Sequence, residues 1–121
     1  MAPAQGARVQ RRFRLTRSED FQKVRRTGKS YAHPLLVLVV RANDGREVRV
    51  GVAAGRAVGP AVKRNRAKRL MRAAMQVFVE SLPAGWDLVL IARPPLLSST
   101  FLEVRGALQS LLNRAQLLLP S

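Results

Sequence analysis

Residues 63–72 read KRNRAKRLMR, and this stretch carries six basic side chains and no acidic one. We expect it to form the opening turns of a helix, because Pro60 just before it is well tolerated in a first turn. A helix N-terminus already carries about half a positive elementary charge, so these cations repel the helix dipole and one another. A bound polyanion reverses the sign of that cost. The stretch is therefore predicted to face nucleic acid.

This central helix is predicted to run from Pro60 to about Leu82. A helical period of about 3.6 residues gathers small and apolar positions on one side. They are Ala67, Leu70, Ala74, Val77, Phe78 and Ser81. The opposite side gathers Asn65, Lys68, Arg69, Arg72 and Gln76. One side should therefore pack against the rest of the fold, while the other stays basic and accessible.

A short helix and two β-rich runs precede the central helix. Thr16 and Glu19 have capping-box spacing and predict the start of the short helix, and Gly28 can end it. The β-rich runs, residues 35–41 and 47–53, are joined through the turn-forming residues Asn-Asp-Gly. This arrangement predicts a β-hairpin.

One strand and one helix follow the central helix. Residues 86–92 are predicted to form a strand that Pro94 and Pro95 close. Thr100 and Glu103 have capping-box spacing and predict the start of a last helix. The apolar stripe of that helix is Phe101, Val104, Leu108, Leu111, Leu112 and Ala115.

The predicted order is helix, strand, strand, helix, strand, helix. This order indicates an α/β (α+β) two-layer sandwich with a small sheet covered mainly by helices. A chain of 121 residues is long enough to bury one such core. Residues 1–14 hold four arginines and few apolar side chains, so we predict a flexible basic arm there and a single domain over residues 15–119.

The composition predicts a polyanionic partner. The chain has 22 basic and 7 acidic residues, a formal net charge of +15, and 18 of the basic residues are arginine. Arginine forks onto phosphate and stacks on bases, which favours nucleic acid over lipid or an acidic protein. The chain has no cysteine, and no apolar run approaches the roughly 18 residues of a membrane span. We therefore expect a cytoplasmic location and no membrane association.

The residue types offer little for catalysis by the protein itself. The seven acidic residues form no recognisable metal-ligand pattern, and the one histidine, His33, precedes Pro34 without an evident partner. The glycine loop at residues 55–59 lacks the lysine and hydroxyl of a P-loop. Its Arg56 belongs to a segment, residues 49–78, with eight cations and no acid. Binding is therefore predicted, without a protein active site or a direct metal site.

A second basic group surrounds an aromatic residue on the first predicted helix. It comprises Lys23, Arg25, Arg26 and Lys29 around Phe21, with Tyr31 just beyond. Aromatic faces stack on unpaired bases, so this mixture suits single-stranded RNA. Phe21 also has helical spacing to Val24 and is equally well explained as a core residue.

Residues 61–72, AVKRNRAKRLMR, closely resemble the RNR signature of the protein subunit of bacterial ribonuclease P. Three further matches occur in the family's order. They are SEDFQKV at 18–24 followed by Gly28, RVGV at 49–52, and LVLIARP at 88–94 before the last helix. The resemblance spans about residues 13–115.

The resemblance implies an RNA-based endonuclease whose RNA subunit carries the catalytic centre. The protein is then expected to assist that RNA in removing the 5′ leader of precursor tRNA. The implied partners are the ribonuclease P RNA and the leader, with no obligate protein partner. Mg²⁺, held mainly by the RNA, is the implied metal ion. The family fold also implies a left-handed βαβ crossover, against the general right-handed rule.

The matched positions imply two sets of RNA-binding residues. The RNR helix and its neighbouring loop should face the catalytic RNA through Lys63, Arg64, Asn65, Arg66, Lys68, Arg69, Arg72 and Arg56. A cleft between the first helix and the sheet should hold the single-stranded leader with Phe21, Arg25, Tyr31 and Arg49.

The chain departs from the family pattern at the expected cleft and loop. Where the family often has a second aromatic residue one turn after Phe21, this chain has Arg25, and Val39 stands at the position of a cleft tyrosine. Arg25 or Tyr31 is the candidate replacement for these aromatic groups. The family's Ser-x-Ser-Lys-Lys loop is here AAGRA at 53–57, which leaves Arg56 as its cation.

Two other functions agree with parts of the sequence. A ribosomal-type RNA-binding protein without a processing role fits the charge and the small α/β fold equally well. A protein-only nuclease requires its carboxylates to gather around a metal ion, and the sequence gives that function little support.

Overall fold

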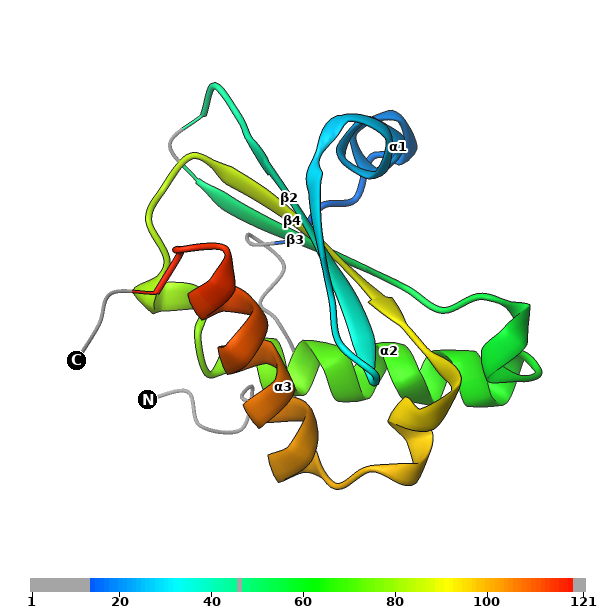
Figure 1. The fold of residues 1–121 in the computed structure, drawn as a ribbon. Helices are drawn as coiled ribbons and strands as arrows, with labels where there is room; N and C mark the ends of the chain where they lie inside the picture. The colour runs from blue at the N-terminus through cyan, green and yellow to red at the C-terminus, as the bar shows by residue number, and fades with distance from the viewer. Residues whose placement is uncertain (1–13, 46, 119–121) are drawn as a thin grey trace, which may run out of the picture.

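The computed structural model describes residues 14–45 and 47–118, which form three α-helices and one four-stranded sheet (Figure 1). In chain order these elements are α1 (Ser18–Thr27), β1 (Lys29–Ala32), β2 (Leu36–Ala42), β3 (Val48–Ala53), α2 (Ala61–Gln76), β4 (Trp86–Ala92) and α3 (Phe101–Arg114). The short 3₁₀ helices η3 (Arg56–Val58), η4 (Val79–Ser81) and η5 (Pro94–Ser98) lie between them. The predicted α+β class is confirmed.

The strand order in the sheet is β1-β2-β4-β3. β2 pairs antiparallel with both β1 and β4, whereas β3 pairs parallel with β4. The predicted hairpin between the runs at 35–41 and 47–53 is wrong, because β4 lies between them. The Asn-Asp-Gly turn reverses the chain, but the two strands that it joins do not pair.

Burial explains why β4 takes this central place. β2 and β4 are mostly buried along their length, whereas Arg49 and Gly51 give β3 one face without large apolar groups. A strand that is apolar on both faces is best covered at the centre of a sheet. β1, with the sequence KSYA, is a short and largely exposed edge strand that the hydrophobic pattern did not predict.

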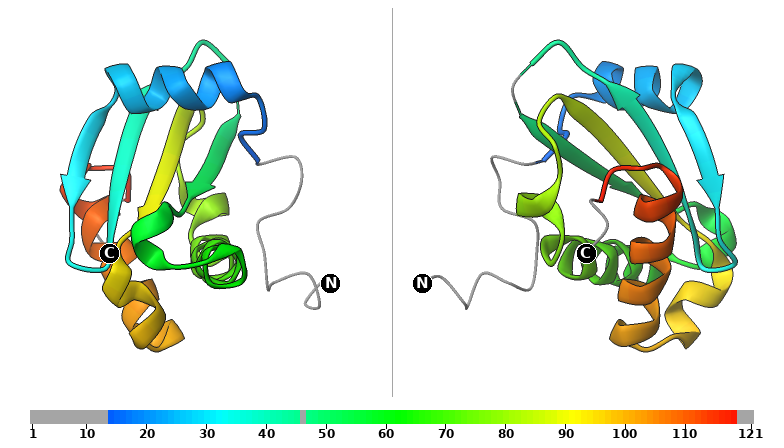
Figure 2. Two further views of the ribbon diagram at one scale, coloured as in Figure 1. Left: turned by 90° about the vertical axis from the view of Figure 1, so that its right-hand side faces the viewer. Right: turned by 60° about the vertical axis from the view of Figure 1, so that its left-hand side comes forward.

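Helices cover both faces of the sheet (Figure 2). On one face α2 and α3 pack against side chains such as Leu38, Val50 and Leu90, which belong to the larger core cluster. On the other face α1 lies over β2 and β4, where Val24 meets Val39 and Val89. The strand alternation of about two residues per period assigns these side chains to opposite faces.

The predicted basic arm falls almost entirely outside the described residues. Within residues 1–14 the structure describes Arg14, which forms a parallel bridge with Val50 at the edge of β3. The next residue, Leu15, is buried, and its N–H donates to the carbonyl of Val50 at 2.8 Å. The boundary between an arm and a domain at residues 14 and 15 stays a prediction.

The two predicted capping boxes have different outcomes. α3 has its box, because Thr100 Oγ1 accepts from the Glu103 N–H at 3.1 Å and Glu103 Oε1 accepts from the Thr100 N–H at 2.8 Å. The box at Thr16 is wrong. α1 begins after Arg17 and has no side-chain cap, because the preceding residues are extended along β3. Gly28 ends α1 as predicted.

α2 is shorter than predicted. It ends at Gln76 rather than near Leu82, and the 3₁₀ turn η4 follows. Val77, assigned to the packed side, is 50% exposed. Met71 and Met75 are buried instead, together with the predicted Ala67 and Ala74. Pro83 and Gly85 then redirect the chain into β4, and Gly85 has a φ of 90°.

The parallel pairing of β3 and β4 determines where α2 begins. Parallel neighbours cannot be joined by a tight turn, so the chain returns through a crossover. η3 and α2 lie on that crossover, and α2 therefore starts near the carboxyl end of β3. The left hand of the crossover, which the family resemblance implies, stays a prediction.

Gly51 provides a test of how α1 is seated on the sheet. A Cβ at this position would lie 2.8 Å from Phe21 Cε2, so Gly51→Ala should displace the Phe21 ring. We expect a loss of about 1–3 kcal/mol in the free energy of unfolding, measured by urea denaturation. The control is Gly106→Ala within α3, where a Cβ has open space. This variant should gain about 0.5–1 kcal/mol, and equal effects of the two changes would contradict the packing.

Candidate nucleic-acid interface

Residues 61–72 of α2 present a basic surface. We call its residues the α2 surface: Lys63, Asn65, Arg66, Lys68, Arg69 and Arg72, of which Lys68 and Arg72 are half-buried and the rest exposed. The first turn of α2 has no acidic residue, and its N-cap, Pro60, supplies no side-chain hydrogen bond. The first amide N–H groups of a helix have no partner within the helix. Cations and amide donors are therefore concentrated at this end of α2.

Arg64 differs from the other predicted RNA-facing residues. Its side chain is half-buried, and Arg64 Nε is shielded from solvent without a hydrogen-bond partner. Lys68 and Arg72 are half-buried as well, so the difference lies in the environment of one guanidinium nitrogen. The assignment of Arg64 to the RNA-facing set stays a prediction, with one guanidinium nitrogen of its side chain shielded from solvent.

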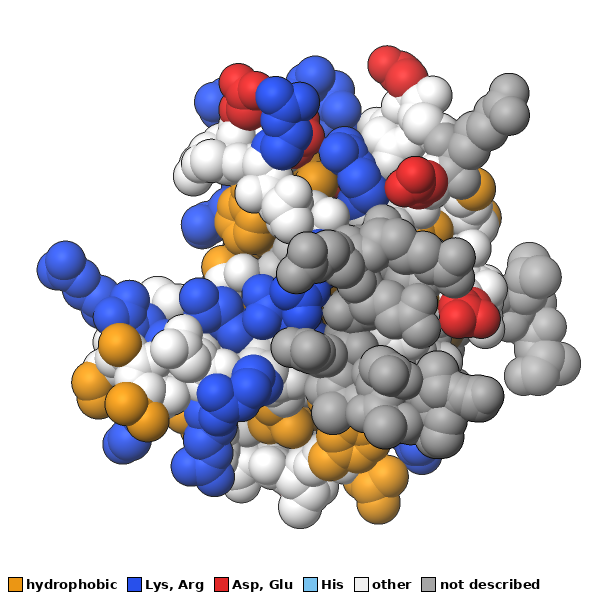
Figure 3. Space-filling model, turned by 180° about the vertical axis from the view of Figure 1, so that it is seen from behind, with side chains coloured by type: hydrophobic (Ala, Val, Ile, Leu, Met, Phe, Trp, Pro, Cys, Tyr) orange, Lys and Arg blue, Asp and Glu red, His pale blue; other side chains and the backbone are white. Residues whose placement is uncertain are grey.

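The predicted loop cation lies directly ahead of α2. Arg56 begins η3 and is exposed. Gly59 has a φ of 140°, and a Cβ there would meet the Lys63 side chain at 2.9 Å. Glycine thus allows the Lys63 stem to lie across the loop. Figure 3 shows Lys and Arg side chains gathered over this end of α2, whereas the acidic side chains in that view lie above it and toward the right.

A groove joins the α2 surface to α1. This Phe21 groove has a volume of about 300 Å³ and is lined by Arg14, Leu15, Thr16, Phe21, Val50, Gly51, Val52 and Arg72. Phe21 is half-buried and rests against Gly51. Two arginines therefore border a half-exposed aromatic ring. The sequence pattern suggested Phe21 and Arg72 separately, but not their proximity or the participation of Arg14.

Tyr31 does not join Phe21 at this groove. It pairs in register with Leu38, and its ring packs against the larger core on the α2 and α3 face. Lys29 Nζ lies 5.6 Å and Arg114 Cζ 5.9 Å from the ring centroid, a cation–π arrangement. The sheet separates Tyr31 from Phe21, so the expectation that both line one cleft is wrong. Arg25 is exposed on α1.

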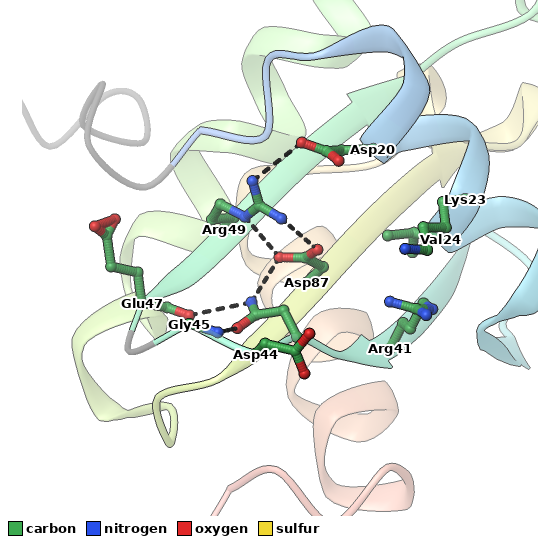
Figure 4. Close-up of a pocket in the computed structure, with 10 residues that line it drawn as sticks. Asp20, Lys23, Val24, Arg41, Asp44, Gly45, Glu47, Arg49 and Asp87 are labelled. Carbon is green, nitrogen blue, oxygen red and sulfur yellow. Dashed lines mark hydrogen bonds and ion pairs between the residues drawn. The ribbon is translucent and has the colours of Figure 1, made fainter.

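Arg49, also assigned to the cleft, is held by two carboxylates (Figure 4). Its Nε and Nη2 donate to the two oxygens of Asp87 at 2.9 and 2.8 Å, and its Nη1 donates to Asp20 at 3.2 Å. The hydrogen bonds to Asp87 raise the pKa of the Arg49 guanidinium above its ordinary value, against the opposing effect of burial. The charge of Asp20 adds to the rise. Arg49 is therefore permanently charged and internally paired.

Asp87 is the residue that the sequence reasoning missed. It is 3% exposed and lies in the otherwise apolar strand β4. A buried carboxylate requires a partner of opposite charge or hydrogen-bond donors. Asn43 Nδ2 also donates to Asp87, at 2.8 Å. We call Asp20, Asn43, Arg49 and Asp87 the Arg49 network, and the isolated acid in an apolar strand was its one sequence signal.

A second cavity of about 450 Å³ adjoins the Arg49 network (Figure 4). Its charged and polar lining consists of Asp20, Lys23, Arg41, Asn43, Asp44, Glu47, Arg49 and Asp87. Over residues 14–45 and 47–118, histidine, cysteine and carboxylate side chains form no group of three or more suited to a metal ion. Within those same ranges no helix is long and apolar enough to cross a membrane.

The α+β fold, with a basic helix beside a groove that holds an aromatic ring, defines a nucleic-acid-binding class of protein. Comparison with known sequences is more specific. The Ribonuclease P family profile matches residues 9–116. The ribonuclease P protein component of Herpetosiphon aurantiacus is 37% identical over 109 residues, 90% of this chain and 89% of that protein. That of Clostridioides difficile is 34% identical over 104 residues, 85% of this chain and 91% of that protein.

Solved structures agree with the sequence comparison. The RNase P protein of Staphylococcus aureus superposes with a TM-score of 0.78 at 29% identity, covering 88% of this chain and 98% of that chain. The RNase P protein of Thermotoga maritima gives a TM-score of 0.73 at 31% identity, covering 84% and 96%. The chain belongs to the ribonuclease P protein family. The predicted family is confirmed, and the ribosomal-type alternative is not favoured.

The charge at the start of α2 should cost stability and can be tested there. Lys63 lies in the first turn, so Lys63→Glu replaces a repelled cation with an anion that the helix dipole attracts. We expect the free energy of unfolding to rise by about 0.3–1 kcal/mol at low salt while RNA binding weakens. Arg105→Glu, an exposed site beyond the first turn of α3, is the control and should give no such gain. Equal stabilisation of the two variants would contradict a dipole effect.

Proposed function

We propose that this protein is the RNA-binding subunit of a ribonuclease P ribonucleoprotein and assists a catalytic RNA in removing the 5′ leader from precursor tRNA. The observation that carries the proposal is the continuity between the α2 surface, which has no acidic residue, and the Phe21 groove, with Arg72 belonging to both. Membership of the family gives the RNA-processing role. The division of that role between two surfaces is our inference.

The α2 surface is the proposed contact with the catalytic RNA. Its exposed side chains Lys63, Asn65, Arg66 and Arg69 lie within residues 63–69 of a single helix, and Arg56 lies in η3 just before that helix. Lysine and arginine neutralise phosphates and release condensed counterions. The same binding offsets the repulsion among these cations, so the RNA surface and the helix start stabilise one another.

The Phe21 groove is the proposed contact with the single-stranded leader. The half-exposed Phe21 ring provides a surface for stacking an unpaired base, while Arg14 and Arg72 line the same groove and can pair with phosphates. Arg25, one helical turn after Phe21, extends the basic surface along α1. Tyr31 is not part of the proposed leader contact, because it lies on the opposite face of the sheet from Phe21. Arg49 is not part of it either, because its guanidinium is paired with Asp20 and Asp87.

The chemistry is assigned to the RNA subunit. Mg²⁺, held mainly by that RNA, supplies the metal-ion chemistry of the cleavage. The described carboxylates do not fit a metal site of their own, since Asp20 and Asp87 are engaged with Arg49. The protein's contribution is therefore binding and orientation. We place this activity in the cytoplasm, consistent with a chain that contains no cysteine.

The decisive experiment measures cleavage of precursor tRNA by the purified protein, by the cognate catalytic RNA, and by both together at low Mg²⁺. We expect efficient cleavage only from the combination. Arg66→Ala and Arg69→Ala should reduce it while changing the free energy of unfolding by less than about 0.5 kcal/mol, because both side chains are exposed. Robust metal-dependent cleavage by RNA-free protein would sink the proposal.

Salt dependence provides an independent measurement on the same complex. If six to ten phosphates are neutralised, affinity for the catalytic RNA should fall by about 10³- to 10⁵-fold between 50 and 200 mM salt. Each alanine variant at Arg66 or Arg69 should reduce the slope of log affinity against log salt by about one. Arg105→Ala on α3 is the matched control and should leave the slope unchanged.

A further inference from the structure

We propose that Asp20, Arg49 and Asp87 form an internal strut that positions α1, and with it Phe21, for leader binding, and that Arg49 does not itself contact RNA. The inference rests on the proposed function of the Phe21 groove and names the residues that set its geometry. Asp20 and Asp87 are positioning residues, since they act on the groove through Arg49 and α1 rather than by contact with the leader.

The strut joins three elements through one side chain. Each of the three guanidinium nitrogens of Arg49, on β3, donates to a carboxylate: two to Asp87 on β4 and one to Asp20 on α1. The bidentate fork onto Asp87 fixes the plane of the guanidinium. Because Asp87 is 3% exposed and lies on β4, one of the two central strands, the fork is anchored within the sheet.

Asn43, in the connection between β2 and β3, also holds the Asp87 carboxylate in place. Its Nδ2 donates to Asp87 at 2.8 Å and to the carbonyl of Glu47 at 3.3 Å. Its Oδ1 accepts from the Gly45 N–H at 2.8 Å. The connection between β2 and β3 is thus tied to the same carboxylate. Asp87 is held by donors from two directions, so it presents a fixed acceptor to Arg49.

α1 depends on this attachment more than a longer helix would. Val24 is its one fully buried side chain, and its N-cap makes no side-chain hydrogen bond. Its first turn is held at two neighbouring points, where Asp20 meets Arg49 and Phe21 meets Gly51. Arg49 and Gly51 are alternate residues of β3 and share one face. The height of the Phe21 ring above the sheet therefore follows the position of Asp20.

The charges argue against a phosphate contact by Arg49. Two carboxylates against one guanidinium leave this cluster with a net charge of −1. A phosphate that approached Arg49 would meet Asp20, whose side chain is 29% exposed. The exposed cations of α1 and α2 offer contacts without this repulsion. Arg49, whose side chain is 33% exposed, therefore serves the groove through its carboxylate partners.

The Asp20→Asn variant distinguishes a positioning role of Asp20 from a direct electrostatic effect, because the two predict opposite changes in binding affinity. Removing an acid near a polyanion should tighten binding, whereas loss of the strut should weaken it. We expect the reconstituted holoenzyme to lose about three- to tenfold in its affinity for precursor tRNA relative to mature tRNA without a leader. The slope of affinity against salt should not change. Asp20→Glu, which keeps the charge, should restore part of the preference.

Glu19→Gln is the matched control for charge. Glu19 is the adjacent residue of α1, its side chain is 80% exposed, and its ion pair with Arg17 is also exposed. Its neutralisation should leave the leader preference within about twofold of the unchanged protein or tighten it. Affinity for the catalytic RNA alone should be the same in Asp20→Asn, Glu19→Gln and the unchanged protein, because the α2 surface is untouched.

Arg49→Lys tests the same inference independently, and its result can be interpreted even if the Asp20→Asn protein does not fold. Lysine keeps the charge but loses the planar fork, so a strut predicts a loss of leader preference like that of Asp20→Asn. A direct phosphate contact predicts that most of the preference survives. Circular dichroism at the assay temperature establishes that each variant is folded.

The outcomes distinguish this inference from the proposed function. A folded Asp20→Asn protein that binds the leader as tightly as the unchanged protein, or a folded Arg49→Lys protein that retains the preference, would overturn the strut alone. If the holoenzyme with the unsubstituted protein does not distinguish precursor from mature tRNA, the proposed leader contact is overturned, and the strut with it. Loss of leader preference in both variants, with catalytic-RNA affinity intact, supports both.

Discussion

The burial of β2 and β4 on both faces is the constraint on which the rest of the structure depends. Two central strands with apolar residues on either side require a layer of helices above and below the sheet. α1 covers one face, and α2 with α3 covers the other. Because β3 pairs parallel with β4, the chain must cross over after β3, and α2 is on that crossover. The basic helix start and the groove at Phe21 are both consequences of this arrangement.

The acidic residues Asp20 and Asp87 pair with Arg49, whereas the start of α2 is basic. Asp87 and Asp20 are engaged with Arg49, and Asp44 and Glu47 line the cavity beside them. The first turn of α2 has no acid to compensate its cations. Buried pairing keeps a carboxylate charged without leaving it on the binding surface. An exposed basic helix start is a poor choice for stability alone, and it becomes favourable when a polyanion binds.

Local chemistry predicted several features of this fold well. The Thr100 and Glu103 capping box, the end of α1 at Gly28, the strand at 86–92 and the packed Ala67 and Ala74 all follow from residues close in sequence. The predicted hairpin was wrong because strand pairing depends on which strands are buried on both faces. The predicted place of Tyr31 in the leader cleft was wrong for a related reason. A shift of one residue in strand register decides the face on which a side chain lies.

The sequence by itself determined most of the elements, the excess of arginine and the family, because these depend on composition, spacing and motif. Only the tertiary structure decided that β4 separates β2 from β3, that Arg72 and Arg14 meet Phe21, and that Arg49 is held by Asp87 and Asp20. These contacts join residues far apart in the chain. They depend on the packing of whole layers and on the pairing demanded by a buried carboxylate, neither of which is expressed by neighbours in the sequence.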